Sequence, residues 1–153
     1  MKTIGSGWSA PDFTLPDEAG TPRKLGDFLA KGPVVLFFYP GAMTSGCTAE
    51  SCHFRDLAAE FDAVGAQRIG ISADTVDKQK EFADAHSFDY PLLSDPDGAV
   101  AAAYGVKRRF LTPVKRATFV ITADGKIADV ITSEFDMNVH ADDALKALQR
   151  KAA

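Results

Sequence analysis

The spacing of hydrophobic residues changes along the chain and predicts strands that alternate with helices. Residues 34–39 form an unbroken apolar run of β-branched and aromatic side chains, which is typical of a central strand buried on both faces. Apolar residues then recur at helical spacing over 54–64, so a helix of four or more turns is expected to follow. Further strands are predicted at 68–72, 91–94, 117–122 and 127–132. Further helices are predicted at 75–86, from 97–98 to about 105, and at 141–151.

The order of these elements predicts an α/β fold. Residues 13–15 alternate with polar neighbours before a turn-like segment at 17–20, which predicts a short N-terminal β-hairpin. Asp124-Gly125 favours a tight turn between the last two strands, so these are expected to pair as a hairpin. Alternating strands and helices that end in a hairpin predict a central mixed β-sheet flanked by helices. No repeat or linker interrupts the pattern, so residues 1–153 are expected to form a single domain.

Composition narrows the function classes. The chain has 153 residues, of which 46% are hydrophobic and 25% charged, as in an ordinary globular protein. Its net charge of −4 argues against nucleic acid or an anionic membrane as the main partner. No apolar run is long enough to cross a membrane, and residues 1–7 lack the apolar region of a signal peptide. The expected location is therefore cytoplasmic.

Cys47 lies where the predicted central strand gives way to a helix N-terminus. The unpaired N–H groups there and the helix dipole favour a thiolate. Thr44 or Ser45 is expected to cap the helix, and Glu50 to lie in or near its first turn. The Thr44 hydroxyl is close enough to reach the sulfur or a substrate oxygen beside it. Pro40 lacks an N–H and is expected to close the loop rigidly, which would help to exclude bulk water.

The second cysteine, Cys52, follows five residues later on the same predicted helix. Such a pair is about 140° apart around the axis, with Cα atoms roughly 8–9 Å apart, which is beyond the ~7 Å limit for a disulfide. A bridge would require the first helical turns to unwind. Two cysteines do not form a disulfide scaffold, so redox catalysis, metal binding and plain burial remain as alternatives. A Cys-x4-Cys spacing argues against a thioredoxin-type disulfide reductase, which uses Cys-x-x-Cys.

The segment Pro40-x-x-x-Thr44-x-x-Cys47, followed by Thr48-x-Glu50, resembles the active-site pattern of peroxiredoxins. A second cysteine five residues later is similar to the peroxiredoxin Q, or bacterioferritin-comigratory, branch. The chain departs from the pattern at Ser45, where many members have proline, and at 41–43, where they carry a charged loop. The resemblance extends through residues 10–17, 54–56, 90–95, 104–106, 116–121 and 124–127. It implies a thioredoxin-like fold with an N-terminal extension.

The resemblance also implies a chemistry. Cys47 would attack hydrogen peroxide or an organic hydroperoxide and become a sulfenic acid, with no metal or organic cofactor. Cys52 would condense with it to form an intramolecular disulfide, which thioredoxin or a similar dithiol protein would reduce. Arg116 matches the family's arginine near the cysteine, where a guanidinium would favour thiolate and hold the peroxide oxygens. Glu50 would steady this arginine or accept from backbone N–H groups. The branch resembled implies a monomer, with a dimer as the alternative.

Several alternatives remain open from the sequence. The chain could instead be a peroxide-responsive redox sensor or binding module, in which oxidation unwinds the helix and alters a surface. The segment 110–113 could be an exposed apolar tip that docks a partner or another subunit, or a loop folded onto its own domain. The basic residues that compete with Arg116 are Lys107, Arg108, Arg109 and Lys115. Three histidines, His53, His86 and His140, lack the spacing of a zinc site and are expected to be solvated or lightly packed.

Overall fold

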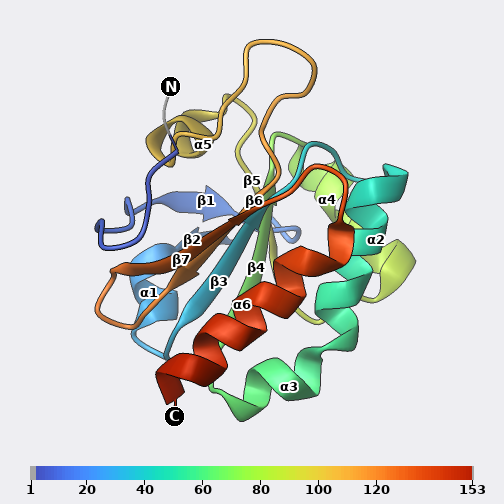
Figure 1. Cartoon of the computed structure of the whole chain (residues 1–153). Helices are drawn as coiled ribbons and strands as arrows, with labels where there is room; N and C mark the ends of the chain where they lie inside the picture. The colour runs from blue at the N-terminus through green and yellow to red at the C-terminus, as the bar shows by residue number, and fades with distance from the viewer. Residues whose placement is uncertain (1–2, 153) are drawn as a thin grey trace.

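The computed structural model describes residues 3–152 and has a five-stranded sheet at its centre, in the order β5-β4-β3-β6-β7 (Figure 1). The central strand β3 (Val34–Phe38) runs parallel to β4 (Gln67–Ser72), which in turn is parallel to β5 (Leu92–Ser94). On its other side, β3 pairs antiparallel with β6 (Ala117–Ile121), and β6 pairs antiparallel with β7 (Ile127–Thr132). The sheet is therefore mixed, as the sequence predicts.

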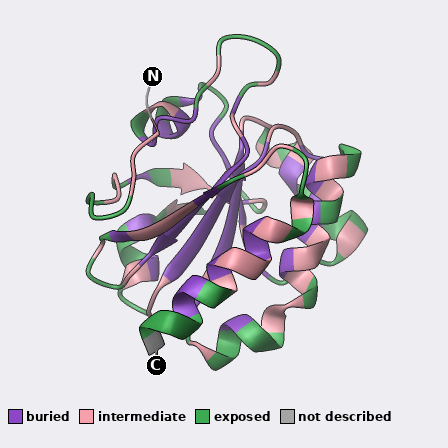
Figure 2. Ribbon diagram, in the orientation of Figure 1, coloured by how far each residue is buried: buried purple, intermediate pink, exposed green. Residues whose placement is uncertain are grey.

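Helices cover both faces of this sheet, because the apolar side chains of β3 alternate between the two faces. The helices are α1 (Leu25–Leu29), α2 (Ser45–Asp56), α3 (Ala58–Ala63), α4 (Val76–His86), α5 (Ala99–Ala103) and α6 (Met137–Ala152). Leu36 belongs to one core cluster, together with buried residues of α1 and α5. Phe37 belongs to the second, together with buried residues of α2, α3, α4 and α6. In Figure 2 the central strands are buried along most of their length.

The N-terminal hairpin forms as predicted, as a small separate sheet. Strands β1 (Thr14–Pro16) and β2 (Pro22–Lys24) pair antiparallel. The buried Asp17 holds the turn between them, because its Oδ1 accepts from the backbone N–H groups of Ala19 at 2.9 Å and Thr21 at 3.0 Å. This extension adds a layer beside the main sheet, next to β5.

The predicted long helix after β3 is two helices, and the prediction of one continuous helix is wrong. Leu57 separates α2 from α3 with a backbone at φ −95° and ψ 19°. The carbonyl of Phe54, near the end of α2, accepts a hydrogen bond of 2.9 Å from Arg68 Nη1 of β4. A tertiary contact therefore engages the helix backbone where the helix is interrupted, and hydrophobic spacing alone carries no sign of it.

The last helix begins at Met137, not at Ala141 as predicted. Asp136 caps it, since its Oδ1 accepts from the backbone N–H groups of Asn138 at 3.1 Å and Val139 at 3.2 Å. The aspartate is a normal capping residue, so the sequence does contain this signal. Within residues 3–152, no helix combines the length and apolar composition needed to cross a bilayer.

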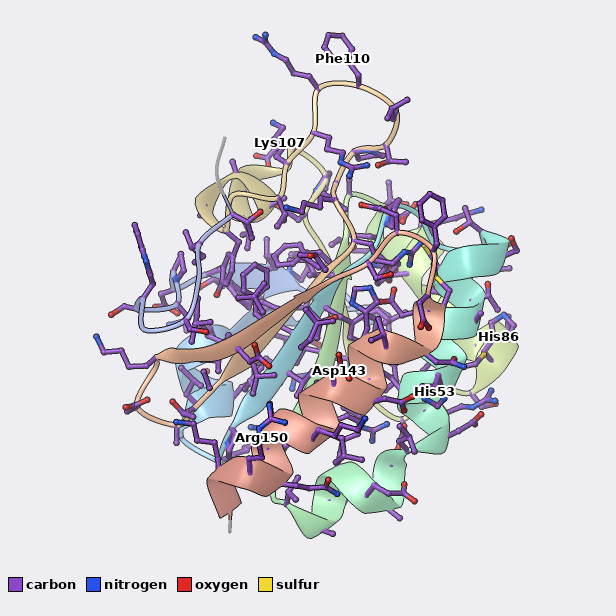
Figure 3. All side chains as sticks on the ribbon, viewed as in Figure 1. His53, His86, Lys107, Phe110, Asp143 and Arg150 are labelled. Carbon is purple, nitrogen blue, oxygen red and sulfur yellow. The ribbon has the colours of Figure 1, made fainter. Side chains whose placement is uncertain are left out.

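The loop between α5 and β6 projects from the molecule, and Figure 3 shows Phe110 at its outer end. Its base is closed by an antiparallel bridge between Lys107 and Val114. At its tip, Phe110 is 78% exposed and Leu111 is 96% exposed. The alternative in which this tip folds onto its own domain is therefore wrong, whereas docking to a partner stays a prediction.

Candidate active site

Cys47 occupies the first turn of α2 and is fully buried. The first helical hydrogen bond runs from Thr48 N to the carbonyl of Thr44, at 2.9 Å, so the amide of Cys47 has no acceptor within the helix. The sulfur therefore lies at the positive end of the helix dipole, as the sequence predicts. The surrounding apolar cluster includes Phe37 of β3 and Phe54 of α2, whose rings stack with centroids 4.1 Å apart.

Arg116 brings a positive charge to the sulfur. Its Nη2 lies 3.3 Å from Cys47 Sγ, and its Nη1 donates to Glu50 Oε1 across 2.6 Å. Arg116 directly precedes β6, whose first residue, Ala117, pairs with Phe38 of β3. Burial by itself lowers the pKa of the Arg116 guanidinium, but Glu50 and Cys47 more than offset this and raise it. The guanidinium is therefore a permanent charge between the carboxyl and the sulfur.

The competing basic residues bond elsewhere. Lys107 Nζ donates to the Asp97 carbonyl at 2.9 Å, and Lys115 Nζ lies 2.8 Å from Thr3 Oγ1. Arg108 Nη2 pairs with Glu134 Oε1 at 2.7 Å, and Arg109 is exposed. Among these five cations of the described chain, the one that contacts the Cys47 sulfur is Arg116.

Glu50 is fully buried in the second turn of α2, next to the first turn, in or near which the sequence placed it. Its Oε1 binds Arg116, which matches one of the two expected contacts. Its Oε2 has no hydrogen-bond partner among the described residues, and it lies 3.5 Å from His140 Nδ1. Burial raises the pKa of Glu50 to about 8, although the charge of Arg116 acts in the opposite direction. This carboxyl therefore differs from an ordinary surface glutamate.

His140 is completely buried, so the expectation of a solvated or lightly packed histidine is wrong at this position. Its Nε2 lies 2.9 Å from the Ser133 carbonyl, which can only accept, so Nε2 carries the hydrogen. Its Nδ1 lies 2.8 Å from Thr118 Oγ1 and is left as the acceptor when the ring is neutral. Burial lowers the pKa of His140. The sequence did carry a signal, because His140 is spaced four residues from Ala144 and eight from Leu148, on the apolar face of α6.

Thr44 lacks the predicted side-chain cap and the predicted contact with the sulfur, whereas its contact with a substrate oxygen stays a prediction. Its hydroxyl donates to the Gly41 carbonyl at 2.8 Å, and it makes neither a side-chain cap nor a bond to the sulfur. The loop turns back at Met43, which has φ +68°, and so presents the Gly41 carbonyl to the exposed hydroxyl. The loop is held from the other side by Asp74, whose Oδ2 accepts from Ala42 N at 2.7 Å.

Pro40 is partly buried between β3 and this loop, directly after the fully buried Tyr39. It therefore lies at the point where the buried strand becomes the partly exposed loop that leads into α2. Its role in keeping bulk water from the site stays a prediction.

Cys52 lies five residues after Cys47 on the uninterrupted helix α2, and both thiols are free. Cys47 is buried whereas Cys52 is partly exposed. Partial burial raises the pKa of the Cys52 thiol more than Arg55 lowers it. The two sulfurs can therefore meet only if α2 unwinds, as the helical spacing predicts.

Side chains from outside α2 hold its C-terminal half. The Tyr90 hydroxyl donates to the Ser51 carbonyl at 2.7 Å, and Arg68 donates to the Phe54 carbonyl. His53, labelled in Figure 3, pairs with Asp142 of α6 through its Nε2, 2.7 Å from Oδ1. The first turns of α2 carry no comparable side-chain bonds to their backbone among those described. Unwinding is therefore expected to start at the end that holds Cys47.

Together, the mixed sheet covered by helices and the cysteine at the start of α2 define a thioredoxin-like fold that carries a buried thiol site. Comparison with known proteins identifies the family within this class. The sequence model of the AhpC/TSA family matches residues 6–130, and the chain belongs to this family.

Its relatives are peroxiredoxins of the peroxiredoxin Q type. The crystal structure of peroxidoxin BcpB from Mycobacterium tuberculosis is 59% identical, with a TM-score of 0.93, and the match covers 96% of this chain and 97% of that one. Chloroplastic peroxiredoxin Q from Sedum lineare is 38% identical over 95% of this chain and 78% of its own. A structure of the bacterioferritin comigratory protein from Xanthomonas campestris is 31% identical, with a TM-score of 0.84 over 92% of each chain.

These comparisons confirm the resemblance and the thioredoxin-like fold expected from the motifs. They make the chain a peroxiredoxin, and peroxiredoxins are thiol peroxidases that act on peroxides and are reduced by thiols.

Proposed function

We propose that Cys47 is the peroxidatic nucleophile and that it reduces both hydrogen peroxide and organic hydroperoxides. The thiolate attacks one peroxide oxygen, the O–O bond breaks, and a sulfenic acid forms while water or an alcohol leaves after taking up a proton. The sulfur supplies the two electrons. The observation that carries the proposal is Arg116 Nη2 at 3.3 Å from Cys47 Sγ, beside a helix N-terminus. A fixed cation there stabilises both the thiolate and the charge that develops on the leaving oxygen.

The proposal for organic hydroperoxides is supported by two methionines close to the start of α2 in sequence or in space. A Cβ atom at Gly46 would lie 3.5 Å from Met137 Sδ and 3.3 Å from Arg116 Nη2, so Met137 and Arg116 both lie close to Gly46 in the first turn of α2. Met43, in the loop before α2, is 41% exposed. Both methionines offer flexible apolar contacts to an alkyl group. The Xanthomonas relative is described through its alkyl peroxide reduction activity.

Cys52 then acts as the resolving cysteine. Its sulfur attacks the sulfenic sulfur of Cys47, an S–S bond forms, and the sulfenic oxygen leaves as water. Thioredoxin or a similar dithiol protein returns two electrons by thiol–disulfide exchange. The support is the position of Cys52 on the same helix, five residues from Cys47, at a partly exposed site. The chain is proposed to work as a monomer, which light scattering of the reduced and oxidised forms tests.

Rapid mixing of the reduced protein with one equivalent of peroxide tests the proposal. Wild type is expected to consume the peroxide and lose two hydrogens in intact mass, with no thiol left to block. Cys52→Ser is expected to consume one equivalent and stop at the sulfenic acid, which a dimedone adduct traps. Cys47→Ser is expected to be inactive, and an unchanged rate in this variant contradicts the proposal. Full turnover of Cys52→Ser with thioredoxin contradicts the resolving role alone.

A further inference from the structure

Four buried groups form a continuous chain that begins at the Cys47 sulfur, and the mechanism above uses only two of them, Cys47 and Arg116. Cys47 Sγ lies beside Arg116 Nη2, Arg116 Nη1 binds Glu50 Oε1, and Glu50 Oε2 faces His140 Nδ1 across 3.5 Å. The side chains of Glu50 and His140 are both 0% exposed. The unpaired carboxyl oxygen and the unprotonated ring nitrogen therefore face one another in a site without access to solvent.

The charges of this chain do not balance when Glu50 is ionised. A thiolate and a carboxylate next to a single guanidinium leave one net negative charge inside the protein, and an uncompensated buried charge is costly. One additional proton removes this imbalance. Oε1 of Glu50 already accepts from Arg116, so the free position for a proton is on Oε2.

The histidine provides the other half of a site for that proton. With Glu50 ionised and the ring neutral, the lone pairs of Oε2 and Nδ1 would face each other at 3.5 Å. A proton on either atom turns this repulsion into an attraction. The Thr118 hydroxyl, 2.8 Å from Nδ1, can donate or accept, so it accommodates the proton in either place.

We propose that Glu50 and His140 together hold one proton, which leaves the positive charge of Arg116 to be balanced by the Cys47 thiolate. His140 is then a positioning residue, because it acts on the sulfur through Glu50 and Arg116 and touches neither sulfur nor substrate. This inference rests on the proposed function and assigns a charge state to the same site.

The other charged groups around the pair agree with this assignment. Glu134, on the loop before α6, raises the pKa of Glu50, and its own charge is paired with Arg108. Burial lowers the pKa of His140, and so does the charge of Arg116, whereas Glu134 and Asp136, the cap of α6, act to raise it. On the α2 side, the Tyr90 hydroxyl is bonded to the Ser51 carbonyl and stays neutral, since burial raises its pKa. Because the two groups are coupled, the proton belongs to the pair and not to one residue.

A titration without peroxide tests the inference. In a Cys52→Ser background Cys47 is the single thiol, and its ultraviolet thiolate absorbance is followed against pH. His140→Leu removes the group that shares the proton with Glu50, so Glu50 ionises and its negative charge repels the thiolate. The midpoint of thiolate formation at Cys47 is therefore expected to rise by about one pH unit. His140→Asn places an amide oxygen near the position of Nδ1 and is expected to restore most of the shift. In a Glu50→Gln background, which is permanently neutral, His140→Leu is expected to have no effect.

A matched control is His86→Gln, because the His86 ring packs on Phe82 and Phe88 of the α4 region. This substitution is expected to leave the midpoint unchanged. An equal shift from His140→Leu in both backgrounds overturns the inference, since it would show a purely structural role. The absence of any shift also overturns it.

Nitrogen NMR of the three histidine rings gives a second measurement that needs no substitution at His140. The Nδ1 resonance of His140 is expected to change with pH in the wild type and to lose that transition in Glu50→Gln. A resonance insensitive to Glu50→Gln overturns the inference. Both measurements work on the resting thiol, so a protein that shows this coupling but does not consume peroxide would disprove the proposed function alone.

Discussion

The Arg116 guanidinium donates to the Cys47 sulfur across 3.3 Å, although 69 positions separate the two residues in the chain. The contact exists because β6 pairs with β3, so that Ala117 lies opposite Phe38 and the residue before β6 reaches the start of α2. The cation is thus held at the start of a strand that is paired on both sides in the sheet, and not by a free loop. A charge fixed in this way needs little reorganisation when a peroxide arrives.

Replacing Arg116 with Met is expected to slow peroxide reduction by about 100-fold or more, the usual effect of losing one donor to a developing charge. Arg116→Lys is expected to be intermediate, because an ammonium cannot bridge both Cys47 and Glu50 as the planar guanidinium does. The measurement is the second-order rate of Cys47 oxidation by rapid mixing. Lys115→Met is the control, since its amine bonds to Thr3, and a comparable loss in that variant would refute the specific role.

Tyr90→Phe is expected to speed formation of the Cys47–Cys52 disulfide, because it frees the Ser51 carbonyl and loosens α2 between the cysteines. Loss of one buried hydrogen bond is expected to lower the free energy of unfolding by about 1 kcal/mol. The matched control is Tyr104→Phe, which removes a similar bond of 2.7 Å to the Pro11 carbonyl in the other core. It should lower stability similarly and leave the disulfide rate unchanged. Equal acceleration in both variants would show that the effect is global.

Stability is expected to depend on pH through Glu50. Its pKa is raised from an ordinary value of 4.5 to about 8 in the folded protein, chiefly by burial. The folded state therefore binds a proton that the unfolded state releases. The contribution is fully present below pH 4.5 and is lost as pH rises through about 8. The slope is at most about 1.4 kcal/mol per pH unit.

Denaturant unfolding across this pH range, compared between wild type and Glu50→Gln, isolates that contribution. The free energy of unfolding of wild type, measured relative to that of Glu50→Gln, is expected to decrease as pH increases. A constant difference would mean that Glu50 is already ionised in the fold. The His140 contribution runs in the opposite direction, since burial lowers its pKa and its part of the stability is lost as pH falls below about 6.5.

Gly46→Ala is expected to separate stability from activity. A Cβ atom there would lie 3.3 Å from Arg116 Nη2, so the guanidinium must shift by a few tenths of an ångström. Peroxide reduction is expected to fall several-fold, because small displacements of a catalytic group are costly. Stability is expected to hold or rise, since alanine is a better helix residue than glycine. An unchanged rate would show that the guanidinium can adjust without loss.

Much of the fold follows from local patterns that act over short distances. The unbroken apolar run at residues 34–39 must be shielded from water on both faces, and the helices of the two core clusters provide this cover. The position of Cys47 at a helix N-terminus follows from the boundary between that run and the helical spacing after it. Arg116 could be selected among its basic neighbours only through the family resemblance, because charge alone does not distinguish them.

The features that sequence could not supply depend on tertiary contacts. Leu57 interrupts the helix close to the point where Arg68 of β4 donates to the Phe54 carbonyl. The Thr44 hydroxyl donates to the Gly41 carbonyl because of a loop conformation that the residue pattern does not predict. His140 is the exception, since its spacing from Ala144 and Leu148 places it on the apolar face of α6, although the helix predicted from the sequence begins one residue later.

The interruption at Leu57 has a consequence for repeated oxidation cycles. Because α3 is separate from α2, melting of the cysteine-bearing helix has a boundary, and Phe61 can keep its place in the core. In the proposed cycle, the strands beneath α2 would therefore stay covered while the Cys47–Cys52 disulfide forms and is reduced. If α2 unwinds at each turnover as proposed, this boundary keeps apolar core surface from being exposed and so limits aggregation.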